Sequence, residues 1–227
     1  MNMHKFIIIF LLITVGICEA SEKTSYAGTW ISKNYHEKLK ETKSPKKAQR
    51  GSKFIVIPKE SSKSVIMIYQ FHEGVKTSYD SLKINKLSDN SIEIDGESFI
   101  KIDSCQNVNS DGACIVGSIL LKGDYLTTTN QVVKFDSGGN VTGLEDFKYY
   151  DVQLDYYDVG LDIDMIILGR ERPDTKISPA NYSKWLGFKS MDNNLNLYEI
   201  LCKEKEGNEC VEIGFGKILH SLKKETK

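Results

Sequence analysis

The feature that most constrains the fold is a succession of short apolar runs from Lys53 onward, each ended by turn-forming residues. The runs are rich in Ile, Val, Phe and Tyr, which favour β-strands. They lie at 54–57, 65–71, 77–84, 92–94, 99–102, 115–121, 125–129 and 132–135. Helical segments do not alternate with these runs, so the pattern argues against a parallel α/β sheet. The chain is therefore predicted to be all-β.

Turn residues between the runs predict that neighbouring strands are antiparallel. Asp95-Gly96 is typical of a two-residue hairpin, because both central positions of that turn require positive φ. Gly123-Asp124 predicts a second reversal, and the Ser-Gly-Gly-Asn sequence at 137–140 predicts a third. Reversals this tight join strands that lie side by side.

Helical signals are few. A short helix is expected at 34–42, where Tyr35 and Leu39 lie four residues apart in a charged frame. A second is expected to begin at Ser178-Pro179 and to run through Trp185 and Phe188.

The last third of the chain continues the β pattern. Five aspartates between 151 and 164 alternate with apolar residues and lack the spacing of a calcium loop, so outward-facing positions on strands are expected. Residues 195–201 and 211–222 predict a final hairpin. The total is about a dozen strands with one or two short helices, which predicts an antiparallel up-and-down β-barrel.

Residues 1–20 have the pattern of a secretory signal peptide. Lys5 precedes an almost wholly apolar run at 6–17, and small residues stand before a cleavage point after Ala20. The run is about a dozen residues long, shorter than the roughly 20 that a membrane-spanning helix requires. An alternative is a lipoprotein anchored through Cys18, although Ile17 is the wrong size for the residue before a lipidated cysteine. The sequence predicts an exported chain, secreted or periplasmic, in which residues 21–227 form one barrel domain.

Four cysteines follow residue 20, at Cys105, Cys114, Cys202 and Cys210. An even number in an exported chain is typical of disulfides. Of the possible pairings, Cys105 with Cys114 and Cys202 with Cys210 is favoured, because each pair brackets a polar loop that contains a glycine. A zinc site would need closer pairs. Each disulfide is expected to close the tip of a hairpin.

Charge and motif content argue against several functions. The formal net charge is −1 at pH 7, so no field of the whole chain favours nucleic acid. His36, His72 and His220 stand far apart, and the sequence contains no nucleophile elbow, phosphate loop or dinucleotide motif. No metal, no cofactor and no enzyme activity is predicted, although a catalytic site assembled from distant carboxylates or tyrosines stays open.

Two short motifs resemble those of lipocalins and related small β-barrels. Tyr26-Ala27-Gly28-Thr29-Trp30 is similar to the G-x-W motif that begins the first strand of that group. Gly123-Asp124-Tyr125 is similar to its T-D-Y turn, apart from the first residue. The charged segment after Trp30 also looks like bacterial lipocalin-like proteins. The chain departs from the family in ending with strands instead of a helix and in having several strands too many.

The resemblance implies structural roles for a few side chains. Gly28 and Trp30 would open the first barrel strand, with the indole closing the base of the barrel. Arg170 or Arg172 would pack across the Trp30 ring as the family's late-strand arginine does.

The first functional hypothesis is a monomeric exported protein that binds a small apolar or amphipathic molecule inside its barrel. Alternate residues of the run 65–71 share one uncharged face, and the candidate ligand contacts are Met67, Tyr69, Phe71 and Tyr79. The alternative is a non-catalytic cell-surface or periplasmic interaction or structural module, whose barrel is filled by its own side chains. A closed, filled interior would favour this second hypothesis.

Overall fold

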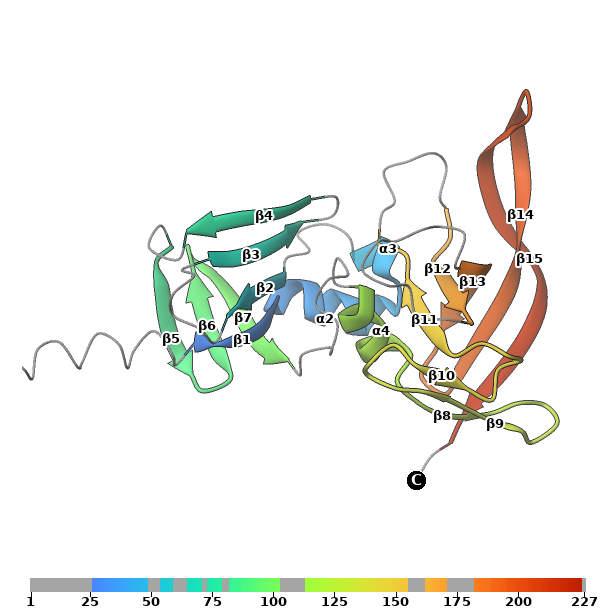
Figure 1. The fold of residues 1–227 in the computed structure, drawn as a ribbon, viewed down its shortest axis with the longest axis horizontal. Coiled ribbons are helices and arrows are strands. Elements are labelled where there is room, and N and C mark those ends of the chain that lie inside the picture. The colour runs from blue at the N-terminus through green and yellow to red at the C-terminus, as the bar shows by residue number, and fades with distance from the viewer. Residues whose placement is uncertain are drawn as a thin grey trace, which may run out of the picture.

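The computed structural model describes residues 26–48, 54–58, 65–70, 73–78, 82–102, 113–154, 162–170 and 182–225. These residues are mostly β-structure, with three short helices. The strands pair antiparallel and form a seven-stranded sheet and an eight-stranded sheet (Figure 1). The prediction of an all-β, antiparallel fold is confirmed.

The seven-stranded sheet is built from the first half of the chain, in the order β4-β3-β2-β1-β7-β6-β5. Its strands are β1 (Gly28–Ser32), β2 (Phe54–Ile57), β3 (Val65–Gln70), β4 (Glu73–Ser78), β5 (Ile84–Ser88), β6 (Ser91–Ile94) and β7 (Glu97–Ile102). β1 lies at the centre, where it pairs with β2 and β7. Asp95 and Gly96 have φ values of 49° and 83° and join β6 to β7, which confirms the predicted hairpin.

The eight-stranded sheet is an up-and-down barrel that is nearly closed. Its strands are β8 (Gly123–Leu126), β9 (Val132–Phe135), β10 (Val141–Thr142), β11 (Tyr149–Val152), β12 (Met165–Gly169), β13 (Tyr182–Ser190), β14 (Asn194–Glu206) and β15 (Glu209–Lys224). A bridge between Asn140 and Tyr149 joins the β10 and β11 ends of this sheet. β15 returns to pair with β8 at Lys223 and Lys224.

The barrel occupies less of the sequence than predicted. The sequence assigns residues 21–227 to one barrel, but the barrel strands begin at Gly123 and the earlier strands form a separate sheet. Eight strands are enough to close a barrel around a core of side chains. The strands before Gly123 are therefore not needed to close the barrel.

Helix α2 (Lys33–Thr42) follows β1, lies between the two sheets, and matches the helix predicted at 34–42. The Ser32 hydroxyl accepts a hydrogen bond from the backbone N–H of Tyr35 (3.4 Å), and Lys43 ends the helix with φ 53°. Tyr35 and Leu39 are buried, as their spacing predicts. They belong to the same core cluster as the side chains of the barrel, so α2 packs the first sheet onto the barrel.

The opposite face of the first sheet has a core of its own. This smaller cluster contains Trp30, Ile55, Ile57, Ile92, Ile94 and Phe99. The described residues therefore form a large core, shared by the barrel, α2 and helix α4 (Ala113–Leu120), and a small core in the first sheet.

Two secondary-structure predictions are wrong. The β-branched run at 115–121 lies in helix α4, where Val116 and Leu121 are completely buried in the core shared with the barrel. Tertiary burial overrides β-propensity in so short an apolar run. The segment through Trp185 and Phe188, predicted as a helix, is strand β13. Leu186 and Phe188 are buried whereas Trp185 and Lys189 are exposed, which is a period of two. Gly187 departs from it because the Phe215 ring covers it.

Two strand boundaries also differ from the sequence prediction. The predicted strand at 77–84 is divided, since β4 ends at Ser78 and β5 begins at Ile84. Gly123-Asp124, expected as a hairpin turn, is the start of β8 directly after α4. The short helix α3 (Pro45–Ala48) comes soon after α2. The final hairpin, β14 and β15, is where the sequence predicts it.

Gly143 occupies a position that only glycine fits. Its φ is +77°, and an added Cβ would lie 2.0 Å from the backbone oxygen of Val132. Gly207, at the tip of the final hairpin, has φ +63° but open space around it. Gly143→Ala should therefore lower the free energy of unfolding by clearly more than the roughly 1 kcal/mol expected for Gly207→Ala from backbone strain alone. Denaturant titration of both variants checks this, and equal losses would contradict it.

Candidate functional site

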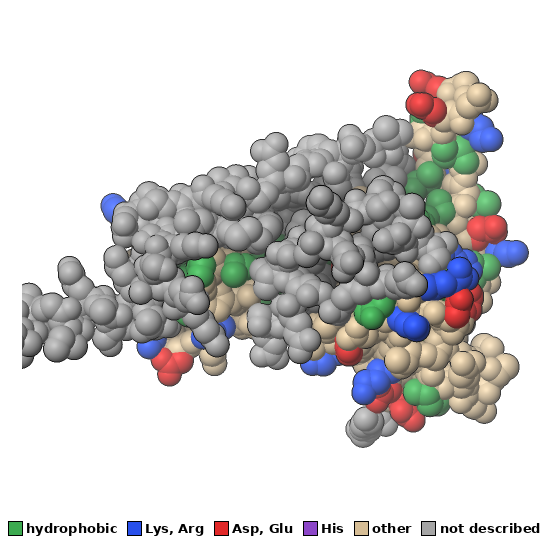
Figure 2. All heavy atoms as spheres, in the orientation of Figure 1, with side chains coloured by type: hydrophobic (Ala, Val, Ile, Leu, Met, Phe, Trp, Pro, Cys, Tyr) green, Lys and Arg blue, Asp and Glu red, His purple; other side chains and the backbone are tan. Residues whose placement is uncertain are grey.

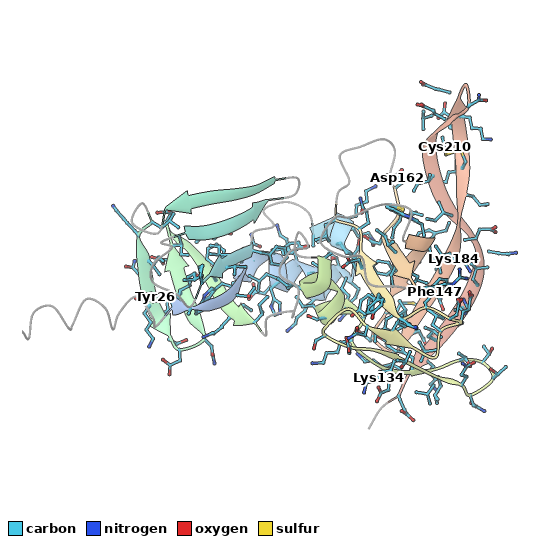
Figure 3. All side chains as sticks on the ribbon, viewed as in Figure 1. Tyr26, Lys134, Phe147, Asp162, Lys184 and Cys210 are labelled. Carbon is cyan, nitrogen blue, oxygen red and sulfur yellow. A yellow bond between two sulfur atoms is a disulfide. The ribbon has the colours of Figure 1, made fainter. Side chains whose placement is uncertain are left out.

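The interior of the barrel is occupied by the protein's own side chains (Figure 3). Phe135 packs edge-to-face on Tyr125 and on Tyr150, with ring centroids 5.8 and 5.1 Å apart. Phe188 and Leu197 are completely buried in the same cluster. Burial raises the pKa of the Tyr125 hydroxyl to about 12, as expected for a phenol in an apolar interior.

Helix α4 covers one end of the barrel. Gly117 lies against the ring of Tyr150, since an added Cβ would be 2.7 Å from its Cε2. The hydroxyl of Ser190, at the end of β13, donates a hydrogen bond to the Leu120 carbonyl (3.2 Å). The Tyr125 hydroxyl donates to the Leu121 carbonyl (2.9 Å). The helix is therefore held to strands on different sides of the barrel.

The connection between β10 and β11 covers the opposite end. Glu145 in this connection accepts hydrogen bonds from Lys184 Nζ (3.3 Å) of β13 and interacts with His220 Nε2 (3.1 Å) of β15. β15 lies across the barrel from β10 and β11, and β13 is separated from β11 by β12, so the connection reaches over the mouth. Phe147 in the same connection is 4% exposed and belongs to the barrel core. Both ends of the barrel are thus covered.

A further ion pair links the connection between β10 and β11 to the residue that follows β12. Arg170 pairs with Asp146, and the hydrogen bond from Arg170 lowers the pKa of the Asp146 carboxyl. The guanidinium of Arg170 and the ammonium of Lys184 each lie 5.9 Å from the centre of the Phe147 ring. Figure 3 shows Phe147 and Lys184 together in this part of the barrel.

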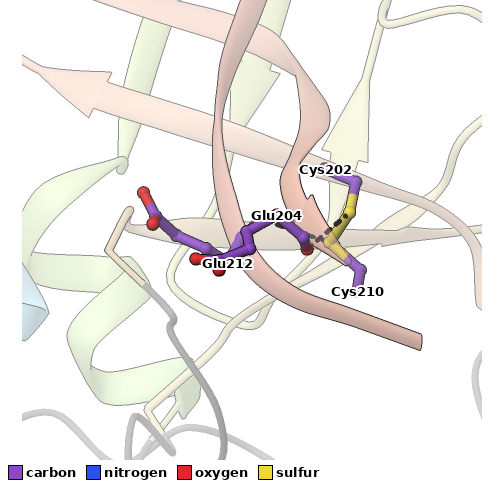
Figure 4. The surroundings of a disulfide bond; sticks show 4 residues. All are labelled: Cys202, Glu204, Cys210 and Glu212. Carbon is purple, nitrogen blue, oxygen red and sulfur yellow. Dashed lines mark hydrogen bonds between the residues drawn. A yellow bond between two sulfur atoms is a disulfide. The ribbon is translucent and has the colours of Figure 1, made fainter. Parts of the chain in front are cut away.

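The final hairpin extends beyond the barrel (Figure 1). β13 pairs with β14 only as far as Tyr198, and β8 pairs with β15 only at residues 223 and 224. The part nearest the turn is bridged by the Cys202–Cys210 disulfide, with the Cα atoms 5.7 Å apart (Figure 4). The sulfur atoms lie 3.1 and 3.2 Å from the carbonyl oxygens of Glu204 and Glu212. This confirms one of the two predicted disulfides.

The outer face of the hairpin is apolar where it leaves the barrel. Phe215 packs on Tyr198 with ring centroids 4.7 Å apart, and it covers Gly187 of β13, where a Cβ would be 2.8 Å from the Phe215 ring. Lys189 Nζ lies 4.5 Å from the centre of the Phe215 ring. Ile218 on the same hairpin is 53% exposed and Trp185 on β13 is 44% exposed. Exposed apolar side chains that lie together are typical of interaction surfaces.

Two of the structural residues inferred from the family resemblance, Gly28 and Trp30, lie outside the barrel. Gly28 and Trp30 are in β1, at the centre of the seven-stranded sheet, and Trp30 is 1% exposed. The cation over its ring is Lys101 of β7, at 5.5 Å, whereas Arg170 is engaged with Asp146 and Phe147. Arg170 therefore does not pack on Trp30, because Trp30 lies in the seven-stranded sheet and Arg170 directly follows β12 of the barrel. Arg172 lies outside the described residues.

The first strand of the barrel has a similar arrangement of a glycine, a buried aromatic ring and a lysine over that ring. Its first strand, β8, opens on Gly123 and Tyr125, with Tyr125 3% exposed and Lys224 of the last strand 5.9 Å from its ring. The sequence contains a glycine two residues before an aromatic residue at both places, with Trp30 in one and Tyr125 in the other. The resemblance places the first barrel strand at Gly28 and Trp30. Only Gly123 and Tyr125, however, are followed by the strands that close the barrel.

Two of the four predicted ligand contacts lie outside the barrel. Met67 and Tyr69 are in β3, which belongs to the seven-stranded sheet, and Phe71 and Tyr79 lie outside the described residues. Cys114 is in helix α4 instead of a hairpin, and its predicted partner Cys105 lies outside the described residues. Residues 1–25, which include Cys18 and the predicted signal peptide, also lie outside them.

Within the described ranges, no group of three or more His, Cys, Asp or Glu side chains is placed to hold a metal ion. No helix in the part of the chain that the structure describes is long and apolar enough to cross a membrane.

Peptide mapping without reduction checks both disulfides. Proteolysis should release a peptide pair that links Cys202 with Cys210 and another that links Cys105 with Cys114. Reduction should separate both pairs. A link between Cys105 and Cys202, or free thiols at these positions in exported protein, would contradict the local pairing.

No family model matches the chain, and no curated protein or solved structure matches it significantly.

Proposed function

We propose that this protein is an exported, lipocalin-like barrel that acts as a non-catalytic interaction module and displays its final hairpin to a protein partner. The eight-stranded up-and-down barrel supports the likeness to lipocalins in architecture. The Cys202–Cys210 disulfide is compatible with an exported chain, since such bonds persist in oxidising compartments.

The observation that carries the proposal is the filled barrel. Aromatic and aliphatic side chains pack through the interior, helix α4 covers one end, and the connection with Glu145 and Phe147 covers the other. Binding a small molecule there would require displacement of packed side chains or opening of a cover. The projecting hairpin is different, because its tip adds nothing to the core. An element of this kind is available for a partner.

The competing hypothesis is binding of a small apolar molecule, and a titration separates the two. The protein is titrated into a fluorescent fatty-acid probe whose emission changes in an apolar environment. The filled barrel predicts no saturable signal that an unlabelled fatty acid can compete away. Saturable, competable binding at one site per chain would overturn the interaction proposal in favour of the ligand-binding one.

The control for this titration addresses the apolar outer face. A probe adsorbed on the surface around Ile218 and Trp185 should lose its signal in the Ile218→Ser variant, whereas a probe inside the barrel should keep it. This distinction matters because both side chains are largely exposed.

A further inference from the structure

The outer face of the final hairpin combines an apolar centre with opposite charges at its two ends. The apolar centre is formed by Trp185, Tyr198, Ile200, Phe215 and Ile218. In the register, Tyr198 lies opposite Ile218 and Ile200 lies opposite Phe215, so these side chains share one face. We call this set the hairpin face.

The tip of the hairpin has a net negative charge, since residues 203–212 contain four glutamates and two lysines, Lys203 and Lys205. Glu206 lies directly opposite Glu209, and Glu204 lies directly opposite Glu212. Like charges at directly opposed positions destabilise a hairpin, so these pairs do not serve its own stability. Only Glu212 has a described cation partner at the tip, Lys203 Nζ at 3.0 Å. The tip therefore favours a positively charged surface.

The base of the hairpin presents lysines on the same outer face. Leu222 and Phe188 are completely buried and point into the barrel, so their neighbours Lys223 and Lys189 point outward. Both lysines are exposed. Figure 2 shows hydrophobic side chains along the hairpin and acidic side chains at its tip. Lys223 lies at the base, whereas the Lys189 ammonium reaches from the base to the edge of the apolar centre, 4.5 Å from the Phe215 ring. The charge thus runs from negative at the tip to positive at the base side of the apolar centre.

We propose that the partner of the hairpin face is a second copy of this chain, packed antiparallel about a twofold axis. Gly216 lies midway in β15 between Glu209 and Lys223. An axis through that position places the tip acids of each copy over the base lysines of the other and brings the two apolar centres together. A twofold interface uses the same patch on both copies, so a patch of this kind must be complementary to itself. This inference rests on the proposed role of the hairpin as the interaction element, and it replaces the monomer expected from sequence.

The hairpin is long enough for such an interface. β15 has 16 residues, which span roughly 50 Å at the usual rise of a strand. A stable interface buries about 800 Å² on each partner. Two hairpins of this length, packed face to face together with β13 of each copy, provide an area of that order.

Charge reversal tests the arrangement. The tip variant carries Glu206→Lys and Glu209→Lys, and the base variant carries Lys189→Glu and Lys223→Glu. The masses of the wild-type chain and of each variant are measured by size-exclusion chromatography with light scattering. The wild type should have twice the mass of one chain, and each variant alone should be monomeric because its tip and base then repel. An equimolar mixture of the two variants should recover a dimer. In that dimer the tip of each chain again has the opposite charge to the base of the other chain.

The mixture also controls for folding, because two misfolded variants could not restore a dimer. A Lys40→Glu, Lys83→Glu variant, with both charges on elements outside the barrel, should stay dimeric. Ile218→Ser should raise the dissociation constant of the dimer about tenfold or more, by removing an apolar contact near the axis. A wild-type monomer, a dimer that survives both reversals, or a mixture that stays monomeric would overturn the proposal.

These outcomes are separate from those of the fatty-acid titration. A wild-type monomer that also fails to bind the probe contradicts the dimer alone and leaves the interaction module with a different partner. Saturable probe binding inside the barrel contradicts the proposed function, whatever the mass of the chain.

Discussion

Replacing Trp30 with alanine should lower the free energy of unfolding by about 3–5 kcal/mol, the range for removing a fully buried large aromatic side chain. Trp30 is 1% exposed and is the largest side chain of the small core in the seven-stranded sheet. Among the described residues of that core only isoleucines and one phenylalanine are as deeply buried, and none of them has the volume of an indole, so a cavity would remain. Its indole Nε1 also donates a hydrogen bond to the Tyr26 carbonyl (2.9 Å), which the variant loses.

The second tryptophan is a matched control. Trp185 is 44% exposed on the outer face of β13, so Trp185→Ala should change the stability of the dilute chain much less. Far-UV circular dichroism in a denaturant titration reports both sheets in both variants. A Trp30→Ala protein within about half a kcal/mol of the wild type would contradict the buried position of Trp30 in β1.

Replacing Phe188 with alanine should have an effect of the same size, also about 3–5 kcal/mol, but on the barrel. Phe188 is completely buried, and it lies on β13 between strands that close the barrel. The core that Phe188 fills also contains Tyr35 and Leu39 of α2. Loss of packing in this core should therefore weaken the attachment of the first sheet to the barrel as well. We therefore expect Phe188→Ala to destabilise both sheets and Trp30→Ala to act mainly on the first.

The fluorescence of the two tryptophans separates these effects, because the chain contains only two, one in each sheet. In Phe188→Ala, the emission of Trp185 and that of Trp30 should both change at lower denaturant concentration than in the wild type. Phe215→Ala removes a phenyl ring from the outer face and should cost less. If Phe188→Ala and Phe215→Ala lose the same stability, the interior position assigned to Phe188 is wrong.

The sequence by itself determined the elements whose signals are local. The Asp95-Gly96 hairpin follows from two adjacent residues that accept positive φ, and helix α2 follows from the spacing of Tyr35 and Leu39. The Cys202–Cys210 disulfide follows from two cysteines that flank a short polar loop. The antiparallel all-β class follows from short runs and tight turns along the whole chain. Each of these depends on interactions between residues close in sequence.

Tertiary structure alone decided how the strands are divided and which residues meet. The run at 115–121 is a helix because it is buried against the end of the barrel, and nothing within the run distinguishes this from a strand. Trp30 and Arg170 lie in different sheets because the barrel closes with the strands after Gly123, and closure depends on the pairing of β15 with β8 across nearly a hundred residues. The cover formed by Glu145, Lys184 and His220 joins three segments far apart in sequence. A single sequence shows periodicity and turns, but a pairing between distant segments is set by the total packing of the core, which only the folded chain contains.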